Sequence, residues 1–304
     1  MKKNLMLIMI LGLSFILPNS AFALTNNNGV EMTQEQYNNL VEVFGESSVD
    51  NMTQEIFDIE KDKEFEYLGE ETIYIESRYR VDAYGNVSHI REIEISEEEY
   101  ENADENQNTG ISLYGAIWET TYKKLTMTMQ GVNPGADGGY TGIKFILTNN
   151  WKIMPAVRSY DIMAFRYFNF IPNTSTVWGQ LRYNETANTT IVQNYTSNSS
   201  GFYAPYGTSI GGFGISMKLP ASTNVYHIES SISIEGNGSS AAGTNYGMYG
   251  TYQHAVKTIA EEMTKQYIIS SNGLGGVIDF RSDSLTAYYD GMQGVSNGGY
   301  EFVY

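Results

Sequence analysis

The sequence predicts a mainly β protein, in which an antiparallel β-sandwich or barrel-like domain with one late helix follows a small acidic α+β module. Charge is the first observation: residues 24–110 hold 23 acidic and 5 basic side chains, whereas residues 111–304 hold 12 and 11. After residue 110, turn residues separate short runs in which β-branched and aromatic residues alternate with polar ones. Only one later segment has a helical period, which argues against a parallel α/β fold.

The change of charge also sets the expected domain boundaries. Residues 24–101 are the acidic module, residues 102–110 a polar linker, and residues 111–304 the β domain. Because the linker should be open to proteases, residues 24–101 are a candidate for a removable acidic pro-region. With 41% hydrophobic and 13% aromatic residues, the 304-residue chain can bury a core.

Residues 1–23 have the pattern of a signal peptide. Lys2 and Lys3 precede an apolar run from Leu5 to Leu17, and a small-residue site ends at Ala23. We expect cleavage after Ala23 and a secreted, bacterial protein. No later stretch approaches the ~20 apolar residues of a membrane-spanning helix. The absence of cysteine excludes a disulfide framework.

The acidic module should begin with a helix. Thr33 and Gln36 form a capping box, apolar residues then recur on one helical face, and Gly45 is placed to end the helix. The start signal consists of an apolar residue, a hydroxyl cap directly after it, and an aromatic residue four positions after the cap. It recurs at residues 52–57 and 95–100. These segments predict two further helix starts, and a repeated docking motif is the alternative.

Residues 72–95 predict a β-hairpin. Apolar and polar residues alternate along residues 72–81 and 87–95, and residues 82–86 supply the turn. Glutamates are expected to face arginines across the two strands, namely Glu76, Glu92 and Glu94 against Arg78, Arg80 and Arg91. Each exposed pair of this kind contributes about 0–1 kcal/mol.

Three segments of the acidic module carry a resemblance. They are Glu35–Leu40 (EQYNNL), Met52–Asp58 (MTQEIFD) and Ile95–Ala103 (ISEEEYENA). Together they resemble the N-terminal leader module of uncharacterised secreted proteins of Gram-positive Firmicutes. The resemblance implies an exported protein and no particular chemistry.

The β domain should contain many short strands. They are expected around Leu125–Met129, Ile143–Leu147, Tyr160–Ala164, Trp178–Tyr183, Gly214–Leu219, Val225–Glu235, Gly276–Phe280 and Leu285–Tyr289. The one late helix is expected over Thr251–Ser270, where apolar residues fit the helical period. The alternative for this segment is two strands broken near Glu261.

A serine hydrolase has two weak candidate residues. Ser209 lies in a G-x-S-x-G pattern, but a glycine-rich strand follows where a nucleophile elbow needs a helix. A triad would have to recruit His254 together with Glu229 or Glu235. The alternative is that Ser209 lies in a plain β-turn.

A glycan hydrolase has two other weak candidates. His227 and Glu229 share the polar face of the strand Val225–Glu235 and would lie about 7 Å apart. A second carboxylate, such as Asp161 or Asp279, would have to come from another strand. The alternative is a solvated strand face.

Tyrosine supplies the candidate ligand-binding residues. Several of the 24 tyrosines lie in glycine-rich segments, where a flat ring with a polar tip suits sugars or protein surfaces. The candidates are Tyr203, Tyr206, Tyr246, Tyr249 and Tyr252. A half-buried place in the strands is the alternative.

Metals and nucleic acids are not expected. Asn133 and Asp137 are weak calcium candidates in a glycine loop, and the three isolated histidines do not form a zinc motif. The net charge of −17 and the lack of a contiguous basic patch exclude nucleic-acid binding. The sequence therefore favours a non-catalytic extracellular binding or surface-interaction protein, for which a cell-wall glycan or a surface protein is a possible partner. A secreted glycan hydrolase and a β-type membrane-perturbing toxin are the alternatives.

Overall fold

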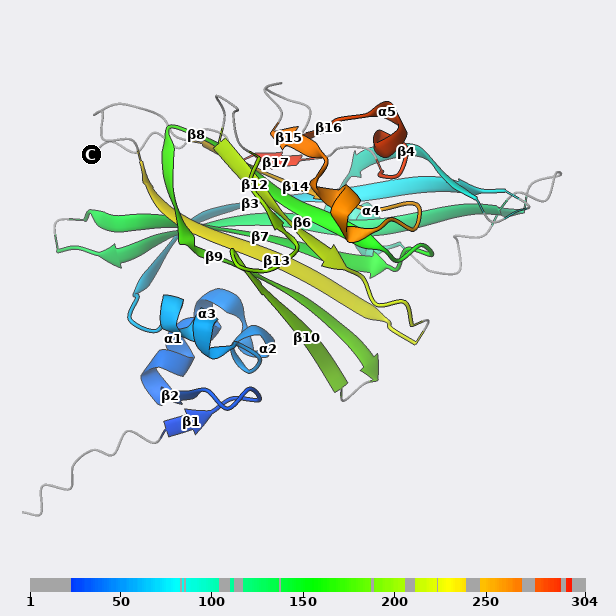
Figure 1. Cartoon of the computed structure of the whole chain (residues 1–304). Coiled ribbons are helices and arrows are strands. Elements are labelled where there is room, and N and C mark those ends of the chain that lie inside the picture. Colours follow the sequence, from blue (N-terminus) through cyan, green and yellow to red (C-terminus); the bar gives the residue numbers. More distant parts are fainter. Residues whose placement is uncertain are drawn as a thin grey trace, which may run out of the picture.

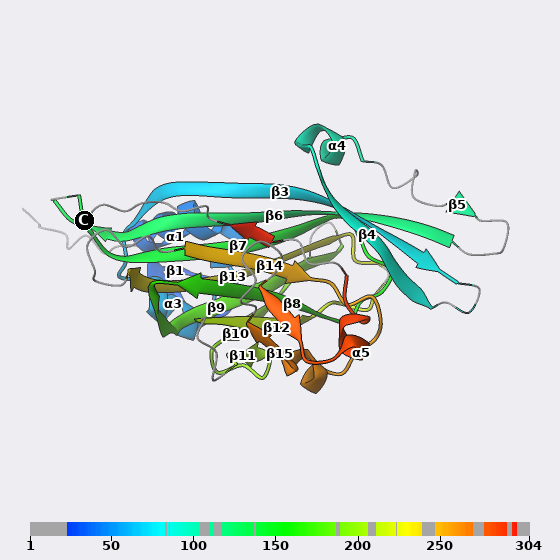
Figure 2. The same cartoon turned by 90° about the horizontal axis from the view of Figure 1, so that it is seen from above.

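A computed structural model describes residues 23–82, 84, 86–103, 110–111, 117–136, 138–186, 189–205, 211–222, 224–238, 247–269, 277–290 and 294–296. Its long strands form two stacked antiparallel sheets (Figures 1 and 2). The large sheet contains β3 (Phe65–Val81), β4 (Val87–Ile95), β5 (Gly110–Ile111), β6 (Ile117–Pro134), β7 (Tyr140–Ile153), β9 (Phe170–Thr186), β10 (Thr189–Thr196) and β13 (His227–Gly238). The small sheet contains β8 (Tyr160–Phe168), β11 (Phe202–Tyr203), β12 (Gly211–Lys218), β14 (Gly247–Gln253) and β17 (Gly294–Ser296).

Both sheets are antiparallel, and several of their adjacent strands, such as β13 and β7, are distant in the sequence. The large sheet runs β10–β9–β13–β7–β6–β3–β4, with β5 paired to the first residues of β6, and the small sheet runs β11–β12–β8–β14–β17. The mainly β, sandwich-like fold expected from the sequence is confirmed.

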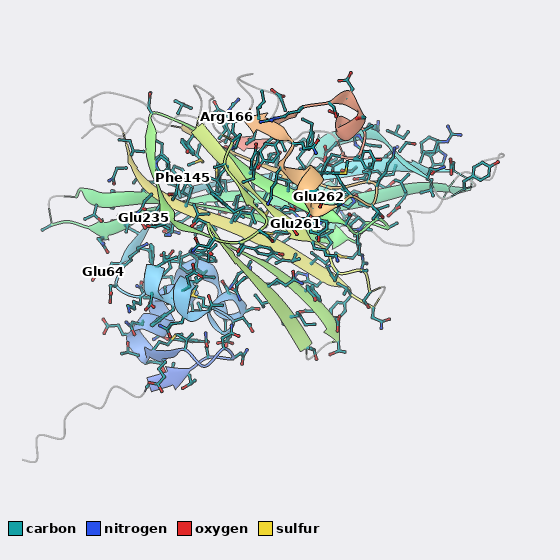
Figure 3. All side chains as sticks on the ribbon, in the orientation of Figure 1. Glu64, Phe145, Arg166, Glu235, Glu261 and Glu262 are labelled. Carbon is teal, nitrogen blue, oxygen red and sulfur yellow. The ribbon has the colours of Figure 1, made fainter. Side chains whose placement is uncertain are left out.

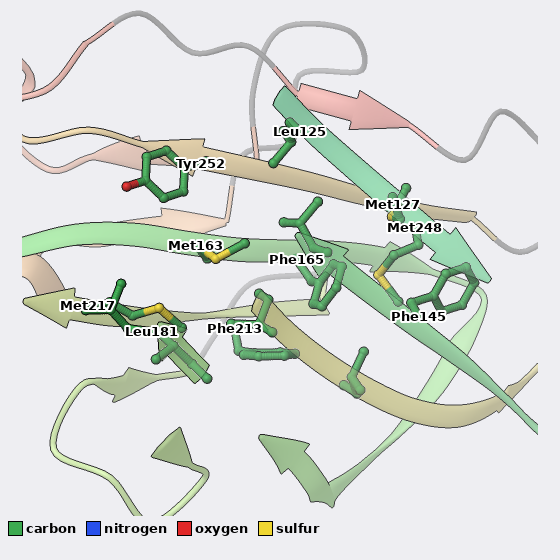
Figure 4. Close-up of a cluster of buried hydrophobic side chains, with 14 of the residues drawn as sticks. Leu125, Met127, Phe145, Met163, Phe165, Leu181, Phe213, Met217, Met248 and Tyr252 are labelled. Atoms are coloured by element: carbon green, nitrogen blue, oxygen red, sulfur yellow. The ribbon is translucent and has the colours of Figure 1, made fainter. Parts of the chain in front are cut away.

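The main core lies between the two sheets (Figure 4). Alternation along β6 turns Leu125 and Met127 inward, while the residues between them face outward. Phe145 on β7 and Phe165 on β8 reach the same layer from opposite sheets, and both are completely buried. The alternate apolar residues of each strand thus determine which of its faces packs in the core between the sheets.

A helical layer covers the outer face of the large sheet (Figure 1). It consists of β1 (Ala23–Thr25), β2 (Glu31–Thr33), α1 (Gln34–Phe44), α2 (Glu46–Val49) and α3 (Gln54–Glu60). The capping box of Thr33 and Gln36 is present, and Thr53 and Ser96 cap α3 and α4 (Glu97–Glu101), so the three predicted helix starts are confirmed. Phe44 packs edge-on against Trp178 of β9 at 5.0 Å between ring centroids, which fixes α1 on the sheet.

A second outer layer covers the small sheet. It is built from the 3₁₀ helix η2 (Glu261–Lys265), β15 (Tyr267–Ile269), β16 (Ile278–Phe280) and α5 (Asp283–Thr286). Tyr267, Ile269 and Ile278 pack on Ile162 and Ala164, the outward residues of β8. The molecule therefore has four layers, with the two sheets inside.

The helix expected over residues 251–270 is wrong. Residues 251–253 belong to β14, and the rest of the segment holds η2 and β15. The alternative of two strands broken near Glu261 is confirmed. The apolar stripe is divided between two layers: Tyr252 enters the core between the sheets, whereas Ile259 and Tyr267 cover β8 from outside. The strand expected at residues 285–289 is also wrong, because α5 includes residues 283–286.

The seam at residues 102–110 does not separate two domains. The hairpin β3–β4 forms as predicted, but β3 pairs with β6 from Phe65↔Val132 to Val81↔Ile117. The helical layer is tied to the same sheet by a buried ion pair, in which Glu60 Oε1 lies 2.7 Å from Lys144 Nζ. Removal of residues 24–101 would take away two strands of the large sheet, β3 and β4, and leave Lys144 buried without its Glu60 carboxylate, which argues against a detachable pro-region.

Candidate functional site

Two sequence candidates, Tyr252 and His254, lie inside the molecule. His254 Nδ1 is 3.0 Å from each carboxylate oxygen of Asp161, and the Tyr252 hydroxyl and the Ala255 amide donate hydrogen bonds to the same carboxylate. Burial favours neutral His254, but the Asp161 carboxylate outweighs burial and raises the His254 pKa. The His254 and Asp161 side chains are only 2% and 1% exposed. The pair is therefore closed to a substrate.

A lysine centre lies beside this pair. Lys123 Nζ is 2.6 Å from Glu92 Oε1 and 2.6 Å from Asp290 Oδ2, and all three side chains are buried. Burial raises the pKa of Glu92 to about 7, against the opposing effect of Lys123. The Asp290 carboxylate also accepts a hydrogen bond from the His254 amide at 2.8 Å. These contacts join β4, β6 and the segment after β14, and their role is structural.

The strand candidates His227 and Glu229 do lie side by side on the outer face of the large sheet. His227 Nε2 is 3.8 Å from Glu229 Oε2, and Glu229 forms an ion pair with Arg182 of β9. Of the two carboxylates suggested as the glycosidase partner of Glu229, Asp161 lies inside the sandwich on the other sheet, and Asp279 lies on β16 in the layer that covers the small sheet. The two residues therefore form no acid–base pair with Asp161.

The tyrosine candidates divide into three groups. Tyr252 is buried, whereas Tyr203 and Tyr249 are half-buried. The Tyr249 ring lies 4.3 Å from the guanidinium carbon of Arg166, with which Tyr249 is directly paired across β14 and β8. Arg166 is labelled in Figure 3. Tyr206 and Tyr246 lie outside the described residues, as do Ser209 and Asp137. The three candidates that lie within the described residues therefore do not form a continuous tyrosine surface.

The calcium candidate Asn133 is used by a turn. It has a φ of 50°, its side-chain oxygen accepts a hydrogen bond from the Glu64 amide at 2.9 Å, and its NH₂ group donates to Thr141 at 3.3 Å. Within the described ranges no group of three or more His, Cys, Asp or Glu side chains is placed to hold a metal ion.

The strongest candidate surface is one that the sequence did not single out. The strands β3, β4 and β6 run past the end of the small sheet and form a projecting ribbon (Figure 2). In this ribbon Arg80 pairs directly with Ser88 on one side and with Trp118 on the other. Arg78 pairs with Arg91. Directly paired residues share a face of the sheet, so the three arginines and Trp118 lie together.

We call these side chains, with Ile90 and Tyr84 beside them, the ribbon patch. Ile90 is the extra residue of a β-bulge between Arg91 and His89, and it is 48% exposed. Trp118 is 41% exposed, and Tyr84 in the hairpin turn is 91% exposed. Large apolar and aromatic side chains exposed together are typical of an interaction surface.

The bulge changes the charge pattern predicted for the hairpin. The glutamates were expected to face the arginines across the two strands, but Glu76 alone pairs with two arginines, at 2.6 Å from Arg78 Nε and 3.4 Å from Arg91 Nη2. Glu92 turns inward to Lys123. The expected pairing is thus wrong for Glu92, and also for Glu94, which pairs with the buried Ile75. The outer face keeps three arginines with Glu76 among them, and Asp82 in the turn interacts electrostatically with Arg80.

The inner face of the ribbon is held by packing. Tyr79 and Val87 are buried with Val256, which follows β14. This cluster fixes the base of the ribbon on the sandwich and leaves the ribbon patch on the opposite, open face. The sequence signals for it were the parity shared by Arg78 and Arg80 and the predicted hairpin that carries Arg91, but nothing local indicated that Trp118 would join them.

Comparison with known proteins adds no family. Neither a protein family nor a curated protein matches the chain. Among solved structures, the collagen-binding domain of a Staphylococcus aureus adhesin has 9% identity and a TM-score of 0.24, over 37% of this chain and 75% of that one. A structure described as manganese lipoxygenase of Gaeumannomyces graminis with partial zonadhesin of Komagataella pastoris has 7% identity and a TM-score of 0.24, over 77% of this chain and 91% of that one. The tailspike protein 4 domain of bacteriophage CBA120 has 13% identity and a TM-score of 0.16, over 38% of this chain and 16% of that one. These scores are too low to support a functional argument.

The described part of the chain includes no helix with the length and apolar character needed to cross a membrane.

Proposed function

We propose that this protein is an exported, non-catalytic binding protein that attaches to an extracellular surface through the ribbon patch. The observation that carries the proposal is the joint exposure of Trp118, Ile90 and Tyr84 beside three arginines at the free end of a β-ribbon. Tryptophan, tyrosine and arginine are the residues that most often dominate binding energy at interfaces. Export is supported by the signal-peptide pattern of residues 1–23.

The catalytic alternatives have less support in the geometry. Asp161 and His254 are sealed inside the fold, and Glu229 is held by Arg182 on a sheet face. A carboxylate paired with a guanidinium stays ionised, which suits neither a general acid nor a shared-proton dyad. A binding role requires none of these groups to reach a substrate.

Binding of the full chain to a panel of surfaces tests the proposal. The panel consists of purified cell-wall glycan, intact bacterial cells, intact host cells and lipid vesicles, each incubated with fluorescently labelled protein. We expect binding to at least one surface, and a loss of about tenfold or more in affinity for Trp118→Ala, as for a hot-spot residue. Ile171→Ala is the matched control, because Ile171 is 60% exposed on β9 and lies outside the ribbon patch.

Three results would contradict the proposal. They are binding to no member of the panel, equal binding by Trp118→Ala and the unsubstituted protein, and chemical turnover of the glycan. The thermal unfolding midpoint of each variant shows whether a loss of binding reflects the surface or the fold.

A further inference from the structure

We infer that the ribbon patch docks on the anionic surface of a phospholipid membrane, with the arginines contacting lipid phosphates and Trp118 and Ile90 entering the headgroup region. This inference rests on the proposed function and names the partner of the same surface. It concerns docking at the membrane surface, for which no membrane-spanning segment is needed.

The arginine arrangement favours phosphate. Arg78 and Arg91 are opposed across neighbouring strands, where side chains start about 5 Å apart, and like charges at this spacing destabilise a sheet. Both guanidinium groups share one oxygen of Glu76. Arg80 follows two residues along β3, about 7 Å away on the same face. Glu76 and Asp82, whose carboxylate interacts electrostatically with Arg80, are two acids against three guanidinium groups. Phosphate oxygens are the preferred bidentate partners of guanidinium groups.

The exposed fractions show that the arginines can reach a ligand. The side chains of Arg78 and Arg91 are each 46% exposed, whereas Glu76 is only 10% exposed. The acid therefore lies at the base of the patch and the guanidinium groups lie above it. A phosphate approaching from solvent meets positive charge first.

The apolar residues favour a lipid headgroup layer over a free anion. Trp118 lies directly across from Arg80, and Ile90 is pushed outward by the bulge next to Arg91. Tryptophan and tyrosine concentrate at the interface between lipid and water, where the ring enters the headgroups and its polar atom stays hydrated. A small soluble phosphate would use the arginines but would leave Trp118 and Ile90 in water.

The position of the patch separates it from the acidic surface. The helical layer and the ribbon lie at opposite ends of the molecule (Figure 1). The nearest exposed acidic helix, α4, packs on the same face of β3, where Glu97 accepts a hydrogen bond from Tyr74, and Tyr74 lies four residues, about 13 Å, along the strand from Arg78. At physiological ionic strength charges are screened over about 8 Å, so the net charge of −17 does not prevent the ribbon from approaching an anionic surface. A narrow projecting ribbon also needs no shaped pocket in a fluid bilayer, whereas an acidic protein partner would have to provide one.

Tryptophan fluorescence gives a direct test, because Trp151 and Trp178 are only 2% and 1% exposed. Trp118 therefore dominates any change of emission at the surface. The full chain is titrated with vesicles of phosphatidylglycerol and, separately, of phosphatidylcholine. We expect a blue shift of emission, protection from acrylamide and co-sedimentation with the phosphatidylglycerol vesicles alone, all weakened by added salt.

Variants assign the binding to the patch. Arg80→Gln should lower the partition coefficient roughly fivefold, the usual effect of one arginine near an anionic membrane. Arg80 is substituted in preference to Arg78 or Arg91, because Arg78 and Arg91 also form ion pairs with Glu76. Trp118→Phe should abolish the emission change and leave sedimentation nearly intact. Arg281→Gln is the matched control, since it removes one exposed positive charge from the layer that covers the small sheet.

Several outcomes would overturn the inference. Absence of binding to phosphatidylglycerol vesicles would do so, as would equal partitioning of Arg80→Gln and Arg281→Gln. If inorganic phosphate protects Trp118 from acrylamide in the absence of vesicles, and also displaces bound vesicles, the patch is a phosphate site. Polyglutamate that binds through Arg80 while vesicles do not would indicate an acidic protein partner.

The two proposals fail in different ways. If vesicles do not bind but another surface of the panel still requires Trp118, only the lipid assignment is wrong. If no surface responds to substitution of Trp118 or Arg80, the proposed function fails as well.

Discussion

Replacing Glu60 by glutamine should strongly destabilise the whole protein. Glu60 is 0% exposed, and its carboxylate meets Lys144 at 2.7 Å, the Trp178 indole N–H at 2.7 Å and Lys63 at 3.3 Å. Burial by itself raises the pKa of Glu60, but these partners outweigh it and the pKa is lowered. Glutamine keeps the shape and removes the charge.

The expected loss in unfolding free energy depends on the partners that remain to Lys144 after the substitution. Lys144 is fully buried, its next carboxylate is Glu235 at 3.9 Å, and its Nζ donates a further hydrogen bond to the Ser233 hydroxyl at 3.4 Å. Lys63 would keep Glu235 at 2.5 Å. Breaking a buried ion pair by removing one partner costs about 3–5 kcal/mol. Because Glu235 can compensate in part, we expect a loss of about 3 kcal/mol in the free energy of unfolding.

Urea unfolding of the full chain, followed by tryptophan emission, measures this loss. Asp58→Asn is the matched control: it breaks the exposed pair with Lys61, also in the helical layer, and should leave the unfolding free energy unchanged. The double variant Glu60→Leu/Lys144→Met should recover most of the stability, because a packed apolar pair can replace a buried ion pair. The reasoning is refuted if Glu60→Gln is as stable as Asp58→Asn.

Three further predictions concern other parts of the fold. Although burial opposes the shift, Asp161 raises the pKa of His254 above its unfolded value of about 6.5. The stabilising contribution of charged His254 is therefore present below that pH and is lost as pH rises through the folded pKa. The stability difference between the unsubstituted protein and His254→Gln should shrink with rising pH, and a constant difference in urea unfolding would contradict this. Thr33→Ala removes the hydrogen bond that the Thr33 hydroxyl accepts from the Gln36 amide, which is one of the two bonds of the capping box of α1, and should cost about 1 kcal/mol, whereas a change within error would show that this cap is not needed. Proteolytic cleavage within residues 104–109 should yield two fragments that co-elute in gel filtration, because β3 and β6 pair along most of their length; separate elution would show that the fragments are independent domains.

Local patterns in the sequence determined most of the elements. The capping residues Thr33, Thr53 and Ser96 set three helix starts, and the alternation around Leu125 and Ile232 set strands and their buried faces. These signals are local, because a cap bonds to residues within one turn and a strand alternates with a period of two. The excess of acid before residue 110 is likewise a property of the chain, but it marked no boundary in the fold.

Only the tertiary structure decided the partners of the charged residues. Lys144 and Lys123 look like ordinary surface lysines in the sequence, yet they are buried against Glu60, Glu92 and Asp290, which are distant along the chain. The same holds for the ribbon patch, since strand pairing and one bulged residue bring Arg91 and Trp118 beside Arg78 and Arg80. Strand register depends on non-local pairing, and a shift of one residue moves every side chain to the other face. For this reason the periodicity predicted strands and their faces, whereas the pairing of strands decided which faces became core, ion-pair centre or exposed patch.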